Sequence, residues 1–345
     1  MNDINIYSKL PGVLLSWYER SKRDLPWRTD REPYHIWISE IMLQQTRVEA
    51  VRGYYARFLA ALPTVDALAC ADDELLHKLW EGLGYYSRVR NLKKAAGIVV
   101  EKFAGVFPEN YEDVLALPGI GEYTAGAICS IAYDLPTPAV DGNVLRVVAR
   151  LTDDALPIDA PEFKRNARRN LLEIYPERAG NFTQALMELG ATVCGPNRKP
   201  DCNNCPCCDF CLGHKRGTAD QLPVKNPKRM RTVEERTVFI LNCDGYYGLV
   251  KRPSTGLLAG LWQFPDVPHK LDVKASLNEV EKMGLKPKEI RRVAEKKHIF
   301  THKEWHMRGV YIDVECRNSE FNWMNEEQIE NDAALPTAFR QFWKE

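Results

Sequence analysis

The chain has 345 residues, of which 45% are hydrophobic and 10% aromatic, and this is enough for two packed domains at roughly 100–200 residues each. A generally disordered chain is therefore excluded. Lys and Arg number 47, as do Asp and Glu, so the net charge of zero does not by itself indicate a nucleic-acid partner. No run approaches the ~18 apolar residues of a membrane span, and the first residues do not form a signal peptide. We therefore expect a cytoplasmic protein without membrane association.

Helical periodicity dominates residues 7–190, where apolar residues recur at i, i+3 and i+4, and Pro and Gly fall mainly between the periodic segments. The helices that this pattern predicts are Pro11–Ser21, His35–Leu62, Asp73–Leu79, Arg90–Phe103, Tyr123–Ala132, Asn143–Leu151 and Phe163–Tyr175. Alternation typical of strands is nearly absent. The sequence thus predicts an all-α domain over residues 1–212.

The character of the chain changes over residues 213–232, a stretch with two prolines that reads as a basic linker. Residues 233–345 then mix the two periodicities and predict an α/β domain. The strands expected there are Thr237–Leu241, Gly248–Lys251 and Val310–Glu315, and the helices are Lys274–Met283 and Glu326–Asn331. The predicted fold is therefore multidomain.

Six of the ten cysteines lie within residues 194–211, which favours a metal site over a disulfide framework. Four of them, Cys194, Cys202, Cys205 and Cys211, have the spacing x7, x2 and x5. Zinc and a [4Fe–4S] cluster both accept four thiolates. The compact run with a single CxxC resembles the cluster loop of endonuclease III relatives, so we expect one [4Fe–4S] cluster. Cys207 and Cys208 leave other choices of four ligands open.

Leu117–Gly126 reads LPGIGEYTAG and places Gly119 and Gly121 at the entrance of a helix. Glycine lets a backbone approach a ligand closely, and the free N–H groups of a helix N-terminus suit a phosphate. The segment resembles the helix–hairpin–helix of DNA repair glycosylases, placed here at about residues 113–130. In that family backbone amides bind a DNA phosphate without reading sequence.

Several further motifs follow one another in the order found in the MutY adenine DNA glycosylases, which the chain resembles over nearly its whole length. These motifs are Leu25–Arg28, Ser39–Thr46, Gly82–Arg88 and Val140–Val144. The resemblance implies a helix–hairpin–helix glycosylase domain with an iron–sulfur loop, followed by a Nudix-like domain. It also implies a monomer that acts in base excision repair on double-stranded DNA, hydrolysing the N-glycosidic bond of adenine opposite 8-oxoguanine or guanine. In a bacterium such a protein would be associated with the nucleoid.

Cleavage of an N-glycosidic bond needs an acid for the leaving base and negative charge near the cationic sugar. Glu40 lies in an otherwise apolar helical stretch, where desolvation should raise its pKa, and the resemblance makes it the acid that protonates adenine. Asp141 stands at a helix start as an N-cap. By resemblance it also stabilises the sugar cation, with assistance from Asn143. Without the resemblance, Glu40 would read as an ordinary solvated carboxylate.

Tyr123 occupies the position at which bifunctional relatives such as endonuclease III carry a lysine nucleophile. Because that amine is absent, the sequence predicts a monofunctional glycosylase that uses water and leaves an abasic site.

The target adenine must leave the duplex to reach Glu40. By resemblance, Gln45 and Tyr85 enter the base stack, and Thr46, Leu83 and Ser87 hold the lesion strand. The candidate walls of the adenine pocket are Trp27, Arg28, Gln184 and Glu188, of which the last two share a helix face. The alternative for Tyr85 is core packing, and the alternative for Gln184 and Glu188 is a purely structural role.

In the C-terminal part, Leu257–Pro265 resembles the segment that leads into the Nudix catalytic helix, but residues 271–284 lack the acidic array of that helix. A recognition role is therefore expected. MutY proteins detect 8-oxoguanine through a Phe-Ser-His loop, and the matching residues here are Phe300, Thr301 and His302. Thr301 keeps the hydroxyl, so its departure from the family pattern is mild.

Three other functions compete with this interpretation: a thymine-mismatch or bifunctional glycosylase, a Nudix pyrophosphatase fused to a DNA-binding domain, and a DNA-binding protein without catalysis. Tyr123 argues against the first, the missing acidic array against the second, and the retention of Glu40 and Asp141 against the third. The neutral net charge also hides two basic segments, residues 194–231 and 286–303, each with a net charge of about +5.

Overall fold

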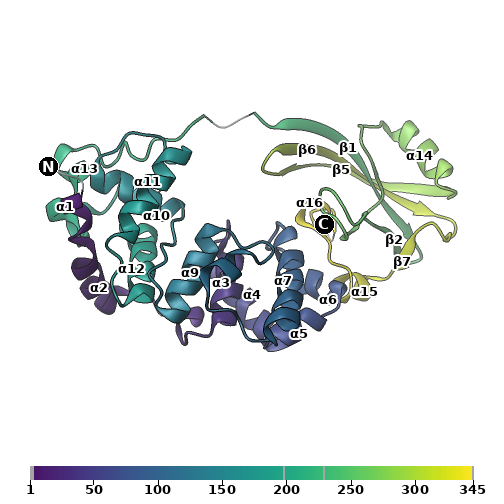
Figure 1. The fold of residues 1–345 in the computed structure, drawn as a ribbon. Coiled ribbons are helices and arrows are strands. Elements are labelled where there is room, and N and C mark those ends of the chain that lie inside the picture. The colour runs from purple at the N-terminus through teal and green to yellow at the C-terminus, as the bar shows by residue number, and fades with distance from the viewer. Residues whose placement is uncertain (1–3, 197–198, 228–229, 344–345) are drawn as a thin grey trace. The chain divides into compact units, whose positions relative to one another are not determined.

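The computed structural model describes residues 4–196, 199–227 and 230–343 (Figure 1). They form two compact units. Unit 1 contains the described residues up to Cys70 together with Asn91–Pro227, and unit 2 contains Ala71–Arg90 together with the described residues from Met230 onward. The basic linker expected at residues 213–232 thus spans the end of unit 1 and the start of unit 2, and its Lys228 and Arg229 lie outside the described residues. The grouping of Ala71–Arg90 with the C-terminal part has no counterpart in the sequence pattern.

Unit 1 is helical throughout its described residues, as the periodicity predicted. Its α-helices are α1 (Ile4–Tyr7), α2 (Leu10–Ser21), α3 (Pro33–Leu43), α4 (Val48–Ala61), α5 (Val65–Cys70), α7 (Ser87–Phe103, whose first turn belongs to unit 2), α8 (Tyr111–Leu115), α9 (Glu122–Tyr133), α10 (Gly142–Thr152), α11 (Pro161–Leu172), α12 (Ala179–Thr192) and α13 (Leu212–Arg216). Three short 3-10 turns are η1 (Pro26–Arg28), η2 (Cys202–Asn204) and η3 (Cys208–Phe210). None of the described helices has the length and apolar composition that crossing a membrane requires.

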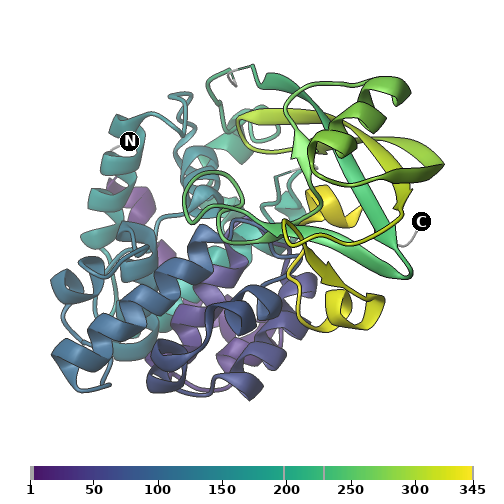
Figure 2. The same cartoon turned by 90° about the vertical axis from the view of Figure 1, so that its right-hand side faces the viewer.

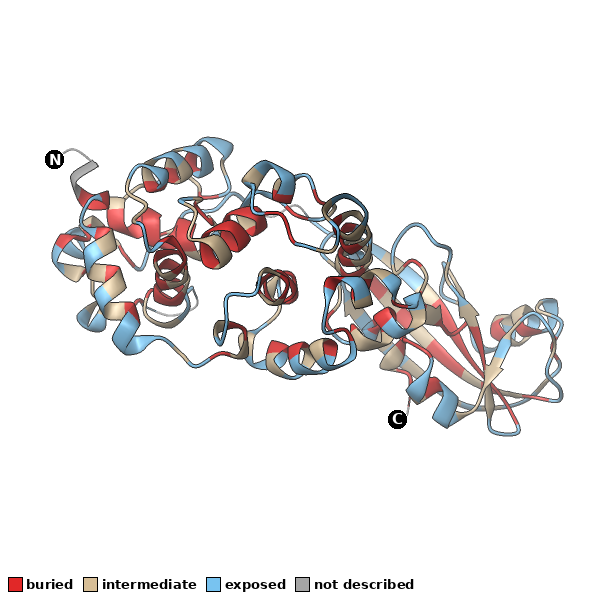
Figure 3. Cartoon of the chain, turned by 60° about the horizontal axis from the view of Figure 1, so that its bottom comes forward, coloured by how far each residue is buried: buried red, intermediate tan, exposed pale blue. Residues whose placement is uncertain are grey.

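The helices α9, α10 and α12 pack closely because glycines lie where they cross, and Figure 3 shows how largely such inner helices are buried. A Cβ atom on Gly180 of α12 would lie 2.8 Å from the carbonyl oxygen of Ser130 on α9. A Cβ atom on Gly190 would lie 2.8 Å from the Cβ of Asn143 on α10. Larger residues at either position would push these helices apart.

The prediction of one continuous helix over His35–Leu62 is wrong, because α3 ends at Leu43 and α4 begins at Val48. Between them Gln45 adopts a left-handed backbone conformation with φ +62°. Such a conformation is uncommon for a residue with a side chain and usually requires support from the surrounding structure. The apolar periodicity continues across this break, so the sequence pattern did not reveal it.

Unit 2 is built on a mixed sheet with the strand order β3-β2-β1-β6-β5, with β4 paired to β1 and β7 to β2. The strands are β1 (Thr232–Cys243), β2 (Tyr246–Lys251), β3 (Trp262–Gln263), β4 (Asp266–Val267), β5 (Pro287–Ile299), β6 (Lys303–Val314) and β7 (Asn322–Met324). Parallel pairing joins β1 to β6, and β5 pairs antiparallel with β6. The strands without a counterpart in the prediction are β3, β4, β5 and β7. Three of them are only two or three residues long, and β5 is an edge strand rich in charge whose alternate residues are only half-buried.

Helices cover both faces of this sheet (Figure 2). Phe239 and Leu241 of β1 pack with Val280 of α14 (Val273–Lys282) on one face. Val238 and Ile240 pack on the other face with the side chains of α15 (Glu326–Asn331) and α16 (Thr337–Arg340). This alternation of side chains along β1 is the period of two expected for a strand buried on both faces.

The helix α6 (Asp73–Leu79) belongs to unit 2 through polar contacts with the C-terminal part. Lys78 donates to the carbonyl of Ala333 at 3.3 Å, and Glu81 pairs with Arg340 at 2.5 Å. Arg90 donates to the carbonyl of Ala259 at 3.0 Å. These bonds attach the loop that follows α6 to the domain that carries the sheet.

Candidate active site

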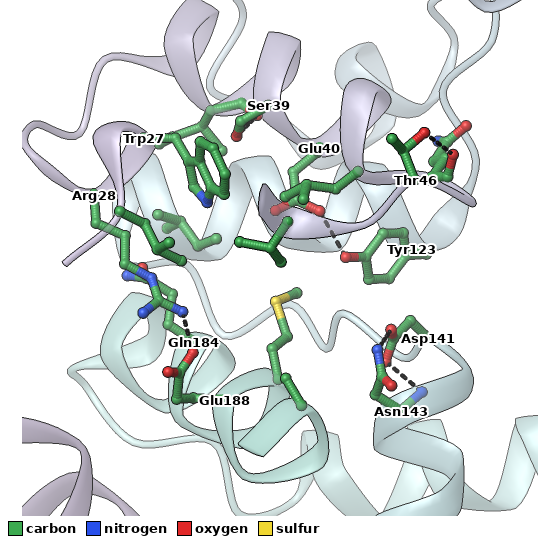
Figure 4. A pocket seen from close by; sticks show the side chains of 18 of the residues that line it. Trp27, Arg28, Ser39, Glu40, Thr46, Tyr123, Asp141, Asn143, Gln184 and Glu188 are labelled. Atoms are coloured by element: carbon green, nitrogen blue, oxygen red, sulfur yellow. Dashed lines mark hydrogen bonds and ion pairs between the residues drawn. The ribbon is translucent and has the colours of Figure 1, made fainter. Parts of the chain in front are cut away.

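A pocket of about 530 Å³ opens in unit 1 between α3, α9, α10, α12 and the turn before α4 (Figure 4). This volume lies in the range of small-molecule sites, roughly 300–1,000 Å³. Ten of the residues predicted from the sequence line it: Trp27, Arg28, Glu40, Gln45, Thr46, Tyr123, Asp141, Asn143, Gln184 and Glu188. The fold therefore brings together side chains that are up to 161 positions apart in the chain.

Glu40 lies on α3 and is only 5% exposed. Its pKa is raised to about 7, mainly by burial and also by nearby Asp141, while the hydrogen bond from Tyr123 and the charge of Arg28 oppose the rise. The hydroxyl of Tyr123, on α9, donates a hydrogen bond of 2.6 Å to Glu40 Oε2 (Figure 4). The expected desolvation of Glu40 is thus confirmed, and a group with this pKa can hold and release a proton at neutral pH.

Asp141 is the N-cap of α10, as the sequence indicated. Its Oδ1 accepts from the backbone N–H of Asn143 at 2.9 Å and of Val144 at 2.8 Å, and its Oδ2 accepts from Asn143 Nδ2 at 2.6 Å. Burial raises the pKa of Asp141, and these hydrogen bonds counteract the rise because they bind the charged form. The cap consequently fixes a carboxylate that faces the same pocket as Glu40.

The opposite end of the pocket holds a buried ion-pair network on η1 and α12 (Figure 4). The side chain of Glu188 has no exposed surface and pairs with Arg28 at 2.7 Å and with Arg23 at 2.6 Å. Gln184 accepts a hydrogen bond of 3.1 Å from the hydroxyl of Tyr18, whose ring also lies under the Arg28 guanidinium at 5.5 Å. Arg28 is therefore held by Glu188, which also lines the pocket, and both Arg28 and Gln184 contact Tyr18, which does not.

Two buried arginines of α10 connect the pocket to the cysteine-rich loop. Arg146 donates to Asn143 Oδ1 at 2.9 Å and to the carbonyl of Cys194 at 2.8 Å. Arg150 donates to the same carbonyl at 3.2 Å and to Cys194 Sγ at 3.2 Å. A continuous set of hydrogen bonds thus runs from Asp141 through Asn143 and Arg146 to the first cysteine of the loop.

The predicted ligands Cys194, Cys202, Cys205 and Cys211 surround one small hollow in unit 1, together with Cys208. Cys207, by contrast, is fully buried in the apolar core. Within residues 4–196, 199–227 and 230–343, no three His, Cys, Asp or Glu side chains are grouped as they are around a single metal ion. Thiolates at this hollow would suit a soft metal centre, and Arg150 beside Cys194 would offset part of their negative charge.

The predicted hairpin consists of α8, the turn Leu117–Gly121 and α9. Gly119 has φ +79°, and a Cβ atom there would lie 2.6 Å from the Cβ of Asn91, so only glycine fits. Gly121 is the N-cap of α9 and provides no side chain to cap it. The N–H groups of the first turn of α9 are consequently open to an external acceptor.

The remaining predicted residues gather in unit 2. Leu83 and Tyr85 lie in the loop between α6 and α7, and Ser87 is the first residue of α7. Phe300, Thr301 and His302 form the turn between β5 and β6. The hydroxyls of Tyr85 and Thr301 are 2.9 Å apart. Tyr85 has φ +47° and is 50% exposed. This contact joins Tyr85, which was predicted to enter the base stack, to Thr301 of the predicted lesion loop.

Sequence reasoning missed Arg23, Tyr18 and Arg146, which contact the predicted side chains. Arg23 lies in the run Ser21–Leu25, where a basic residue reads as a solvated surface charge. No periodicity or spacing marks any of the three. Their importance depends on contacts between residues far apart in the chain.

Comparison with known proteins agrees with this architecture. Residues 38–167 match the model of the HhH-GPD superfamily base excision DNA repair proteins, and residues 236–345 match the NUDIX domain. A thermostable thymine-DNA glycosylase is 27% identical, with a TM-score of 0.55 over 61% of this chain and 98% of its own. An endonuclease III structure, 22% identical, has a TM-score of 0.53 over 63% of this chain and 99% of its own, which shows a shared fold.

Similarity over the whole chain is found among adenine DNA glycosylases. The protein of that name from Rattus norvegicus is 36% identical over 96% of this chain and 76% of its own length. That from Buchnera aphidicola subsp. Baizongia pistaciae is 33% identical over 91% of this chain and 90% of its own. Since both domains and nearly the full length are shared, the chain belongs to the adenine DNA glycosylase family.

Proposed function

We propose that this base excision repair glycosylase is monofunctional and hydrolyses the N-glycosidic bond of adenine opposite 8-oxoguanine or guanine in double-stranded DNA. The observation that carries the proposal is the shared pocket of Glu40 and Asp141, two buried carboxylates whose surroundings differ. Glu40, with a pKa of about 7, is suited to donate a proton. Asp141, with three hydrogen bonds to its charged form, is suited to stabilise a cation.

The proposed mechanism begins with adenine turned out of the duplex into the pocket. Trp27, Arg28 and Gln184 bind the base, and Glu40 protonates it while the bond to the sugar lengthens. Asp141, oriented by Asn143, stabilises the developing positive charge on the sugar. Tyr123 orients the carboxyl group of Glu40 through its hydrogen bond of 2.6 Å. Water then completes the reaction and leaves an abasic site.

In this proposal unit 2 recognises the base opposite adenine. Tyr85 of unit 2 and Gln45 of unit 1 enter the base stack of the DNA. Both residues have a left-handed backbone conformation and an exposed side chain. Phe300 packs edge-to-face on Trp305 at 4.8 Å, which leaves Thr301 and His302 exposed for the lesion. Leu83, Ser87 and Thr46 support the strand, and the hairpin with Gly119 and Gly121 binds a phosphate.

Base release from three duplexes tests this assignment. With A:8-oxoguanine, A:G and T:G substrates of the same sequence, we expect adenine release from the first two, fastest opposite 8-oxoguanine, and no thymine release. Single-turnover assays measure all three rate constants. Thymine release at a comparable rate would contradict the proposal and favour a thymine-mismatch enzyme.

Reductive trapping tests the monofunctional mechanism. Tyr123 carries no amine that could attack the sugar, so we expect no borohydride-trapped complex with DNA and little β-elimination. Denaturing gel electrophoresis after treatment with borohydride measures the trapped fraction, and a bifunctional endonuclease III serves as the positive control. A trapped complex in high yield would overturn the assignment.

We further propose that Cys194, Cys202, Cys205 and Cys211 hold one [4Fe–4S] cluster. The set of thiols around one hollow supports it, as does the hydrogen bond from Arg150 to Cys194 Sγ. Such a cluster, when bound, would supply a compact inorganic centre that links these four thiols. The purified protein is then expected to show the broad visible absorption of an iron–sulfur chromophore. A colourless active preparation with zinc would contradict this, and Cys208→Ser is the matched control because it should leave the absorption unchanged.

A further inference from the structure

The hydrogen bonds of Glu188 differ from those expected of a pocket residue that binds adenine directly. Its Oε1 accepts from Arg23 Nε at 2.6 Å and from the Arg23 backbone N–H at 3.2 Å. Its Oε2 accepts from Arg23 Nη2 at 3.0 Å and from Arg28 Nη2 at 2.7 Å. An ionised carboxylate offers about four lone-pair sites. All of them are used, so Glu188 has no acceptor left for the amino group of adenine.

The same network keeps Glu188 ionised. Burial by itself raises the pKa of this carboxyl, but the hydrogen bonds from Arg23 and Arg28 outweigh burial and lower it. Two cations around one anion leave a net positive charge at this end of the pocket. Glu188 is therefore a counter-ion for the two arginines.

Arg28 is the cation that this network presents to the pocket. Glu188 holds its Nη2, the carbonyl of Arg23 accepts from its Nη1 at 3.1 Å, and the Tyr18 ring lies 5.5 Å below it. A guanidinium has five N–H donors. The donors that remain suit the ring nitrogens of adenine, which are acceptors.

We propose that Arg23 is a positioning residue for adenine excision: it fixes Glu188, and Glu188 together with the Arg23 carbonyl fixes Arg28. This inference rests on the proposed adenine pocket. Arg23 reaches Glu188 from the rim, where its side chain is 34% exposed. Three of the four bonds to Glu188 come from Arg23, two of them through its planar guanidinium. Lysine has a single ammonium group and cannot reproduce that bidentate contact.

The test uses the full chain, single-turnover adenine release and DNA affinity on one A:8-oxoguanine duplex. For Arg23→Met and Arg23→Lys we expect the rate constant to fall at least about tenfold, since small displacements of binding groups cost up to about a hundredfold. The dissociation constant for DNA should change less than about twofold, because Arg23 acts through Arg28 and not on a phosphate. Arg20→Met is the matched control. Arg20 lies on the neighbouring helix α2 and contacts only Ser16 among the described residues, so its variant should match wild type.

A second substrate separates positioning from direct reading of the base. Duplexes with purine, which lacks the 6-amino group, are compared with adenine in the wild type and in Glu188→Gln. The proposal predicts that the variant slows both bases by the same factor. A collapse of the preference between adenine and purine in Glu188→Gln would show that Glu188 binds the amino group, and would overturn the proposal.

The remaining outcomes are also decisive. Arg23→Lys keeps a cation beside the buried carboxylate, so it provides the result if Arg23→Met does not fold. A wild-type rate for Arg23→Lys would overturn the proposal. Arg28→Met shows whether the positioning role or the adenine pocket itself is wrong. If Arg28→Met releases adenine slowly and Arg23→Lys releases it at the wild-type rate, only the positioning role of Arg23 is refuted. Wild-type release by Arg28→Met would refute the adenine pocket itself.

Discussion

Glu40→Gln is expected to lower the rate of adenine release by about 100- to 10,000-fold, the contribution typical of a positioned general acid. The amide cannot donate a carboxylic proton, yet it keeps the size of Glu40 and can accept the hydrogen bond from Tyr123. The fold should therefore persist. Single-turnover assays on A:8-oxoguanine duplexes measure the loss, and unaltered release would remove Glu40 from the mechanism.

Glu49→Gln is the matched control for this variant. Glu49 lies on α4 with a side chain that is 79% exposed, and it forms an ion pair of 3.3 Å with Arg52. The same chemical change there is expected to leave adenine release within about twofold of wild type, because a surface ion pair contributes little.

The pH dependence follows from the same residue. Since the protonated form of Glu40 donates, its contribution is complete well below a pH of about 7 and declines as the pH rises through that value. Above it the rate should fall about tenfold per pH unit. Asp141 has the opposite effect on the rate, because the reaction requires its ionised form. Burial raises its pKa, so the rate should fall as the pH drops through that pKa. The profile should be bell-shaped, with apparent pKa values that belong to the pair, and its alkaline limb should vanish in Glu40→Gln.

Asp141→Asn is expected to lower the rate by about 100- to 1,000-fold, the effect of removing a preorganised charge from a transition state. Asparagine caps helices about as well as aspartate, so α10 should keep its N-terminus. This substitution therefore separates the two roles of Asp141. Thermal unfolding measures the cap, and single-turnover kinetics on the same preparation measures the chemistry.

Asp72→Asn provides the comparison for Asp141→Asn. Asp72 caps α6 through the N–H groups of Glu74 and Leu75, belongs to unit 2 and does not line the pocket. It should show the same small change in thermal stability as Asp141→Asn and no change in rate. If Asp141→Asn lost stability and activity in proportion, the carboxylate would be structural only.

The charge of the C-terminal basic segment shows where reasoning from the sequence was incomplete. Residues 286–303 carry a net charge of about +5, which suggested a surface for DNA. In the fold, strand pairing brings acids beside them: Asp313 pairs with Arg291, Glu304 with Lys297, and Glu234 with Lys303. Glu234 is about 70 positions away in the chain. The positive potential of this segment is consequently smaller than its composition implies.

Local patterns sufficed for much of the fold and of the candidate site. Apolar periodicity predicted most helices of unit 1, and Thr237–Leu241 was predicted as a strand, which lies within β1. The apolar surroundings of Glu40 within one helix predicted its desolvation, and the position of Asp141 before Gly142 predicted its cap. Each of these properties depends on residues within a few positions, so the sequence carries it directly.

Only the tertiary structure decided the rest. The break after Leu43, the grouping of Ala71–Arg90 with the sheet and the contact of Tyr85 with Thr301 each depend on residues far apart in the chain. The same holds for Glu188. In the sequence it is one acidic residue on a helix face, whereas in the fold Arg23 and Arg28 donate hydrogen bonds to it. The sequence by itself indicated the chemistry of this protein, because the motifs that carry it are particular residue types at short spacing. Packing determined which partner each charged group meets, because electrostatic and hydrogen-bond energies depend on distances that only the folded chain sets.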